Sequence, residues 1–139
     1  MDKNGRALAL SGAVLFLGGI LQGFAVDQFA NPRMALSAHL DAVQSGMALM
    51  LAGVLWTVAR WSSGAETVAR WTLAVGMVGL WLGITLAAMT GASDALPMAG
   101  KGFSASPDIE LTATVIIIGS SVALAIGWSL FVVGLFRSR

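Results

Sequence analysis

Residues 71–90, WTLAVGMVGLWLGITLAAMT, contain no charged side chain. A helix rises about 1.5 Å per residue, so a run of this length spans about 30 Å, the thickness of the hydrocarbon core of a bilayer. Lipid offers the backbone no hydrogen-bond partner, and a segment that crosses it must therefore satisfy its own amide groups as a helix. The stretch predicts a membrane-spanning helix over residues 71–90.

Three more apolar runs lie on either side of it, over residues 7–26, 36–59 and 111–136. The chain of 139 residues is 57% hydrophobic and only 11% charged, whereas about a quarter of the residues in a soluble domain are charged. Its mean hydropathy is +0.83. The first run is longer than the apolar part of a typical signal peptide. We therefore predict an all-α fold, an integral membrane four-helix bundle that forms one domain over residues 1–139.

Basic residues are distributed unevenly between the two ends of these spans. One end carries only Arg33 and Lys101, and the other carries Lys3, Arg6, Arg60, Arg70, Arg137 and Arg139. Because basic connections stay in the cytoplasm, we expect both termini to be cytoplasmic. Tryptophans near the second connection are typical of an interfacial aromatic belt, namely Trp56, Trp61 and Trp71.

Small residues four positions apart indicate where the helices pack. The pairs are Gly19 with Gly23, Ala42 with Gly46, and Gly79 with Gly83. Such residues let two backbones approach closely in lipid, although glycine is also simply common in membrane helices. The connection over residues 91–108, GASDALPMAGKGFSASPD, is too rich in Gly, Ser and Pro to be helical, and its last residues favour the start of the fourth helix.

Several function classes are excluded by composition. Cysteine and tyrosine are absent, which removes thiolate and phenolate chemistry, and a net charge of +1 does not favour nucleic-acid binding. Hydrolase, kinase and dinucleotide-binding motifs are missing as well. If the protein is an enzyme, a cofactor is expected to supply the difficult chemistry.

Polar side chains gather instead in residues 31–46, NPRMALSAHLDAVQSG, at the start of the second span. Ionisable residues inside a membrane segment are costly and are functional candidates by default. At 100° per residue, an arc of about 100° holds Ser37, Asp41, Gln44 and Ser45, while the single histidine, His39, lies on a different face. Asp41, Gln44 and Ser45 are candidate proton or hydrogen-bond partners, or else solvated and capping residues near a helix end.

His39 has two interpretations. Small neighbours along its face, such as Ala42 and Gly46, predict a flat recess that accepts a porphyrin edge, with the imidazole as axial ligand and Arg33 available to a cofactor carboxylate. Alternatively, His39 lies near the interface and is satisfied by the preceding loop or by water. Trp81 and Thr85, one turn apart in the third span, either line a pocket or pack against lipid or a neighbouring helix, and Gln22 in the first span is similar.

The string NPRMALSAHL, followed by a glycine seven residues after the histidine in a chain of this length, resembles the hydroxylaminobenzene mutase family of bacterial membrane proteins. That family is in turn similar to styrene oxide isomerase. The resemblance implies that a small aryl hydroxylamine is rearranged to an aminophenol in the bacterial cytoplasmic (inner) membrane. It also implies a homotrimer in which His39 holds the iron of haem b, acting as a Lewis acid at a subunit interface.

The chain departs from the family pattern at three positions. Ser45 stands where these families have an asparagine, and the tyrosine and a second asparagine of the isomerases fall near Ala87 and Gly83. A residue six positions after His39 is rotated by about 120°, so Ser45 is expected to face the haem of the next subunit.

Other functions remain open on the sequence. One is a haem-binding electron-transfer or sensor protein, whose second axial ligand would be Met34, Met47, Met50 or a histidine of another subunit. Others are an epoxide isomerase of the styrene oxide isomerase type and a structural or transport subunit without a cofactor.

Overall fold

The computed structural model describes residues 1–62 and 64–138, which form four long helices and one 3-10 turn. The helices are α1 (Lys3–Gly23), α2 (Pro32–Leu55), α3 (Ala65–Thr90) and α4 (Pro107–Phe136), and the turn is η1 (Val26–Gln28). The described part of the chain contains no strand. All four helices are long and apolar enough to cross a membrane. The predicted all-α, membrane-spanning four-helix bundle is confirmed.

All four helices begin before the apolar runs do. Helix α1 starts behind Asp2, whose carboxylate accepts a hydrogen bond from the Gly5 amide. Helix α2 starts behind Asn31, whose side-chain oxygen accepts from the Met34 amide. Hydropathy locates the buried part of a helix, whereas a capping side chain decides where it starts. Helices α1 and α2 end at Gly23 and Leu55, before the predicted apolar spans end at residues 26 and 59.

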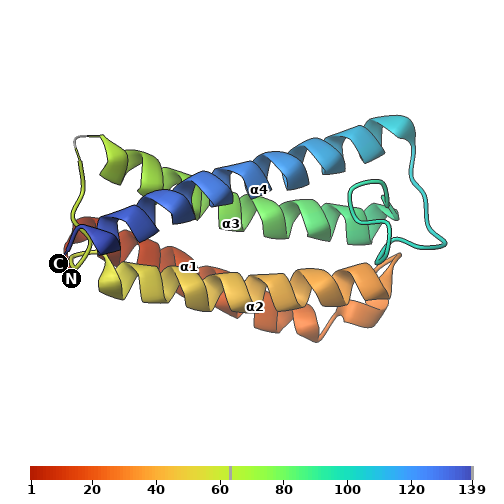
Figure 1. Ribbon diagram of the computed structural model, residues 1–139. Coiled ribbons are helices and arrows are strands. Elements are labelled where there is room, and N and C mark those ends of the chain that lie inside the picture. The colour runs from red at the N-terminus through yellow and green to blue at the C-terminus, as the bar shows by residue number, and fades with distance from the viewer. Residues whose placement is uncertain (63, 139) are drawn as a thin grey trace.

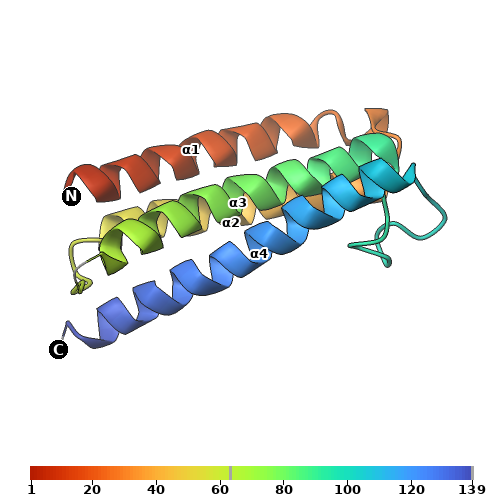
Figure 2. The same cartoon turned by 90° about the horizontal axis from the view of Figure 1, so that it is seen from above.

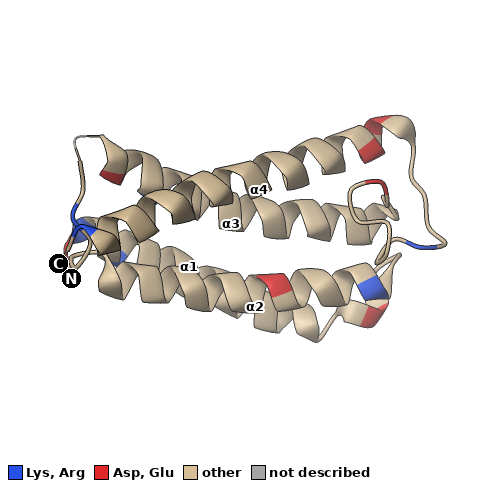
Figure 3. Cartoon of the chain, in the orientation of Figure 1, with Lys and Arg blue, Asp and Glu red and all other residues tan. Residues whose placement is uncertain are grey.

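The helices form two antiparallel pairs (Figures 1 and 2). Helix α1 packs mainly against α2, and α4 packs mainly against α3, while α2 and α3 join the pairs. Both ends of the chain lie at the same end of the bundle (Figure 1). Charged side chains cluster at the two ends of the bundle, and the one acidic position of α2 lies part-way along it (Figure 3). That position is Asp41.

Glycines bring α1 and α2 into backbone contact. A Cβ atom at Gly46 would lie 2.6 Å from the backbone nitrogen of Phe16 and 2.7 Å from the carbonyl oxygen of Gly12. Two turns away, Gly53 and Gly5 face each other in the same way. Seven residues are almost two helical turns, so the contacts repeat along both helices. The predicted packing roles of Gly19, Ala42 and Gly46 are confirmed at this interface.

Glycines also allow close packing between α3 and α4. Gly79 lies against the side chain of Ser120, and Gly83 lies against Ile117, where a Cβ atom would come within 2.8 Å. The predicted pair Gly79 and Gly83 therefore packs against α4. With the two helix pairs fixed in this way, the larger side chains fill the space between them.

The predicted aromatic belt is wrong for Trp56. This side chain is buried between helices, stacks on Phe131 with ring centroids 5.8 Å apart, and lies 4.4 Å from the ring of Trp61. Its indole N–H donates to Glu66. Trp71 is exposed on the outside of the bundle, with the guanidinium of Arg70 over its ring. A position near a helix end does not reveal which way the side chain points, and the side chain of Trp56 points into the core.

Residues 91–106 contain no helix, as predicted, and they fold back onto the bundle. The buried carboxylate of Glu110 accepts hydrogen bonds from the amides of Ser93, Asp94 and Ala105, which anchors both ends of this loop to α4. The side chain of Asn31 donates to the carbonyl of Ala99 and ties the middle of the loop to the start of α2. The loop therefore covers that end of the bundle.

Replacing Gly46 by alanine tests the close approach of α1 and α2. The added methyl group meets backbone atoms that cannot move aside, and we expect the free energy of unfolding to fall by about 1–3 kcal/mol, the usual cost of overpacking. Thermal unfolding of the detergent-purified protein measures the loss. Gly119→Ala is the matched control, because a Cβ atom at this helical glycine has nothing within 4 Å. Equal melting temperatures for the two variants would contradict the packing.

Candidate functional site

His39 is half-buried between α1 and α2. It lies seven residues before Gly46, as Gly46 lies seven before Gly53, and so occupies the next place in the series of close contacts between these helices. Its Nδ1 atom lies 2.7 Å from the carbonyl oxygen of Gly19. A carbonyl oxygen only accepts, so Nδ1 carries the hydrogen and the neutral ring has its lone pair on Nε2. Gly23 makes room for the ring, since a Cβ atom there would lie 2.9 Å from Nδ1. Residues of α1 thus fix both the tautomer and the orientation of this imidazole.

The predicted flat recess beside His39 is absent, because α1 fills it. Ala42 is completely buried against Gly19, and Gly46 is buried against Gly12 and Phe16. The small residues serve close helix packing and leave no slot within the helix pair. The imidazole itself is partly exposed.

The donor set around His39 suits a haem better than a bare metal ion. No group of three or more His, Cys, Asp or Glu side chains that could hold a metal ion occurs in the described residues. A porphyrin brings four nitrogen ligands of its own and needs only an axial side chain from the protein. Metal-ligating histidines commonly donate their second ring N–H to a carbonyl or carboxylate, as His39 does to Gly19. His39 therefore fits the role of an axial ligand.

Arg33 lies in the first turn of α2 and is exposed. Its Nη1 atom donates to the carbonyl oxygen of Met98 in the covering loop, at 3.3 Å. A guanidinium has five N–H donors, so this single contact leaves others for an anionic group. Arg33 precedes His39 by six positions and is rotated about 120° from it around α2.

The polar residues on the other face of α2 do not share one hydrogen-bond network. Ser45 donates to Asp41 Oδ1 at 3.4 Å, so these two candidates lie together. Ser37 donates to the carbonyl of Arg33, and Gln44 is exposed. The second carboxylate oxygen of Asp41 is buried and has no hydrogen-bond partner among the described residues. Such an oxygen is costly in a membrane helix, which marks Asp41 as a candidate proton acceptor.

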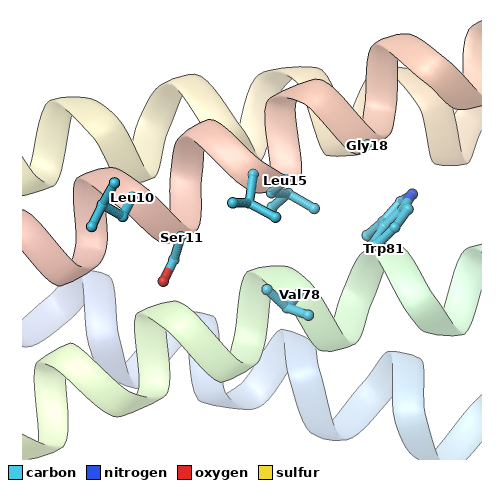
Figure 4. A pocket seen from close by; sticks show the side chains of 7 residues that line it. Leu10, Ser11, Leu15, Gly18, Val78 and Trp81 are labelled. Carbon is cyan, nitrogen blue, oxygen red and sulfur yellow. The ribbon is translucent and has the colours of Figure 1, made fainter.

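Trp81 and Thr85 meet through Gln22. The indole N–H of Trp81 donates to Gln22 Oε1 at 2.7 Å, and Gln22 Nε2 donates to the Thr85 hydroxyl at 3.1 Å. Gln22 is buried, and this cluster links α1 to α3. Trp81 also lines an apolar groove between these helices, whereas Thr85 does not (Figure 4).

The groove itself was missed by the sequence analysis, including its wall residues Ser11 and Gly18. The signal available was weak, because it consisted of one serine and one glycine in an apolar run. Gly83 and Ala87, the positions that depart from the isomerase pattern, are buried where α3 packs on its neighbours.

Comparisons with known proteins extend over nearly the whole chain. The family model described as styrene oxide isomerase matches residues 4–136. Hydroxylaminobenzene mutase HabA of Ectopseudomonas oleovorans is 32% identical over 131 residues, covering 94% of this chain and 97% of that protein. Hydroxylaminobenzene mutase HabB of the same organism is 33% identical over 131 residues, covering 94% of this chain and 80% of that protein. No solved structure matches the chain.

These matches agree with the resemblance drawn from the NPRMALSAHL string and with the four membrane-spanning helices. They extend through α1, α2, α3 and α4, so they include every candidate residue described above. The chain belongs to the styrene oxide isomerase family and is a multi-pass membrane isomerase.

Proposed function

We propose that this protein rearranges a small aryl hydroxylamine to an aminophenol. Two relatives that align over 94% of the chain carry the name hydroxylaminobenzene mutase, which supports this substrate class. In the reaction the N–O bond breaks and a C–O bond forms at a ring carbon. That carbon loses its proton and the nitrogen gains one, so the atoms balance without net oxidation.

The observation that carries the mechanism is the contact between Gly19 and His39. Because the Gly19 carbonyl takes the Nδ1 hydrogen, the lone pair of the neutral ring lies on Nε2, and we propose that His39 would hold the iron of haem b through this atom. When bound, the haem iron supplies a Lewis acid that polarises the oxygen of the substrate. Arg33 offers its remaining N–H donors to the cofactor carboxylates.

Proton transfer falls to the polar residues of the other face of α2. The unpartnered oxygen of Asp41 accepts a proton, and Ser45, already bonded to Asp41, holds and orients that carboxylate. Gln44 is exposed and supplies a hydrogen bond to the substrate. His39 and Ser45 are about 120° apart on one helix, which supports a site shared between copies of the chain. We propose that one copy supplies His39 and the next supplies Asp41, Gln44 and Ser45, in a homotrimer as the family resemblance implies.

The environment of the reaction follows from the fold. The lipid bilayer concentrates small aromatic molecules, and the substrate pocket is proposed to use Trp81 and Thr85 as walls, both held by Gln22. The end that holds the two termini carries the basic residues Lys3 and Arg6, which supports cytoplasmic termini and a place in the bacterial inner membrane.

Epoxide isomerisation is the second candidate function, because the matching family model is that of styrene oxide isomerase. Purified protein given hydroxylaminobenzene and styrene oxide in parallel separates the two candidates. We expect aminophenol from the first substrate, identified by chromatography. Conversion of styrene oxide alone would replace the proposal by epoxide isomerisation, and no conversion of either would overturn both.

The ligand role of His39 predicts that His39→Ala abolishes haem binding. The absorption spectrum of the detergent-purified protein measures this, because bound haem gives an intense Soret band. Ser37→Ala is the matched control, since Ser37 lies two positions away and its hydroxyl donates to the Arg33 carbonyl of its own helix. Equal haem content in wild type and His39→Ala would overturn the assignment, as would a wild-type protein that never binds haem.

The proton-acceptor role of Asp41 predicts that Asp41→Asn keeps its haem content but lowers kcat about 100-fold, a typical loss for general acid–base catalysis. Ser45→Ala is expected to keep its haem and to lower turnover by a smaller factor, because Asp41 itself remains. Asp27→Asn in η1 changes an exposed carboxylate in the same way and serves as control. Wild-type kcat in Asp41→Asn would rule out the role.

A further inference from the structure

An apolar groove of about 450 Å³ runs between α1 and α3. Its lining residues are Leu10, Ser11, Val14, Leu15, Gly18, Val78 and Trp81. The α1 wall includes Val14, whose side chain is 72% exposed, so the groove is open on the outside of the bundle. Both helices are long and apolar enough to cross a membrane, so the opening lies along membrane-spanning segments. The volume lies within the range of sites for small molecules.

Trp81 forms a fixed aromatic surface at one end of this groove (Figure 4). Its indole N–H is held by buried Gln22, which is itself held by Thr85. A Cβ atom at Gly18 would lie 3.4 Å from Cη2 of the indole, so the ring lies close against α1. An aromatic ring that is positioned before a ligand arrives loses little freedom on binding one.

Ser11 supplies a hydroxyl toward the other end of the groove (Figure 4). This hydroxyl makes no hydrogen bond to any residue that the structure describes. Several other helix hydroxyls, such as those of Thr72, Ser121 and Ser129, donate to carbonyls of their own helices. An unpaired hydroxyl on a lipid-facing wall is costly unless a ligand satisfies it. Seven residues separate Ser11 from Gly18, which is about 10 Å along α1.

The groove and the imidazole of His39 lie on two sides of the same stretch of α1. Gly18 and Gln22 face Trp81, while Gly19 and Gly23 contact His39. A molecule in the groove is therefore separated from the His39 contact by a single helix.

We propose that the α1–α3 groove binds the aromatic substrate as it enters sideways from the bilayer, with its ring on Trp81 and its polar substituent on the Ser11 hydroxyl. The choice of an aryl hydroxylamine or an aminophenol as occupant rests on the proposed function. A lipid acyl chain matches the apolar walls but leaves Ser11 without a partner, so an aromatic ring with a polar substituent fits the lining better.

Photolabelling of the full chain in phospholipid vesicles tests the site without requiring turnover. A phenyl diazirine is the probe, aniline is the competitor, and labelled residues are mapped by mass spectrometry. We expect labelling concentrated on residues 10–18 and 78–81 that aniline reduces in wild type but not in Ser11→Ala. Even labelling of all lipid-facing helices, or groove labelling that aniline does not reduce, would overturn the proposal. Stronger labelling of the groove by an acyl-chain diazirine would assign it to lipid.

Filling the groove gives a second test. Val14→Trp places a large side chain at an exposed position that lines the groove, and we expect the KM for hydroxylaminobenzene to rise at least about tenfold with unchanged haem content, as for loss of a binding contact. Leu17→Trp is the control, because Leu17 is also exposed on α1 but lies outside the groove. Equal KM values in both variants would overturn the site. An inactive wild type would instead reject the proposed function, and the photolabelling would still decide the groove.

Discussion

The backbone contact between α1 and α2 is the constraint on which the rest of this structure depends. Glycines on both helices let the two backbones touch at intervals of about two turns. At the third such position α2 carries His39, so an imidazole occupies the place that a glycine holds elsewhere in the repeat. The same close approach that stabilises the pair therefore delivers the Gly19 carbonyl to Nδ1. The packing of α1 on α2 therefore also sets the position and the hydrogen bond of the His39 ring.

Buried polar groups divide this protein into structural and functional parts. The carboxylate of Glu110 accepts hydrogen bonds from backbone amides of the covering loop. The side chain of Gln22 links Trp81 to Thr85 by hydrogen bonds. Both side chains have partners and hold elements together. Asp41 differs, because one of its carboxylate oxygens is buried and has no hydrogen-bond partner in the part of the chain that the structure describes. In a medium that penalises unpaired polar atoms, that difference favours a functional role for Asp41 over a structural one.

Membership of the styrene oxide isomerase family places the protein among isomerases, while its own residues decide how it differs within that family. The positions near Gly83 and Ala87 are used for helix packing and carry no hydrogen-bonding side chain. Polar contacts to a substrate must then come from other places. The groups proposed for this purpose are Asp41, Gln44 and Ser45 on α2 and Ser11 on the groove wall.

The sequence by itself determined the four membrane spans, the irregular loop over residues 91–106, and the short list of polar residues from which a site is built. These properties are local, because hydropathy and capping depend on neighbours along the chain. The family string around His39 was also readable, and the comparisons confirmed the family.

Only the tertiary structure decided which of these residues meet. It placed α1 over the small residues beside His39, buried Trp56 in the core, and joined Gln22 to Trp81 across 59 residues of sequence. Such contacts depend on the rotation and register of one helix against another, which packing between distant segments sets. The physical reason is that hydropathy tells a residue's depth in the membrane, whereas its direction around the helix axis is fixed only when a neighbouring helix packs against it.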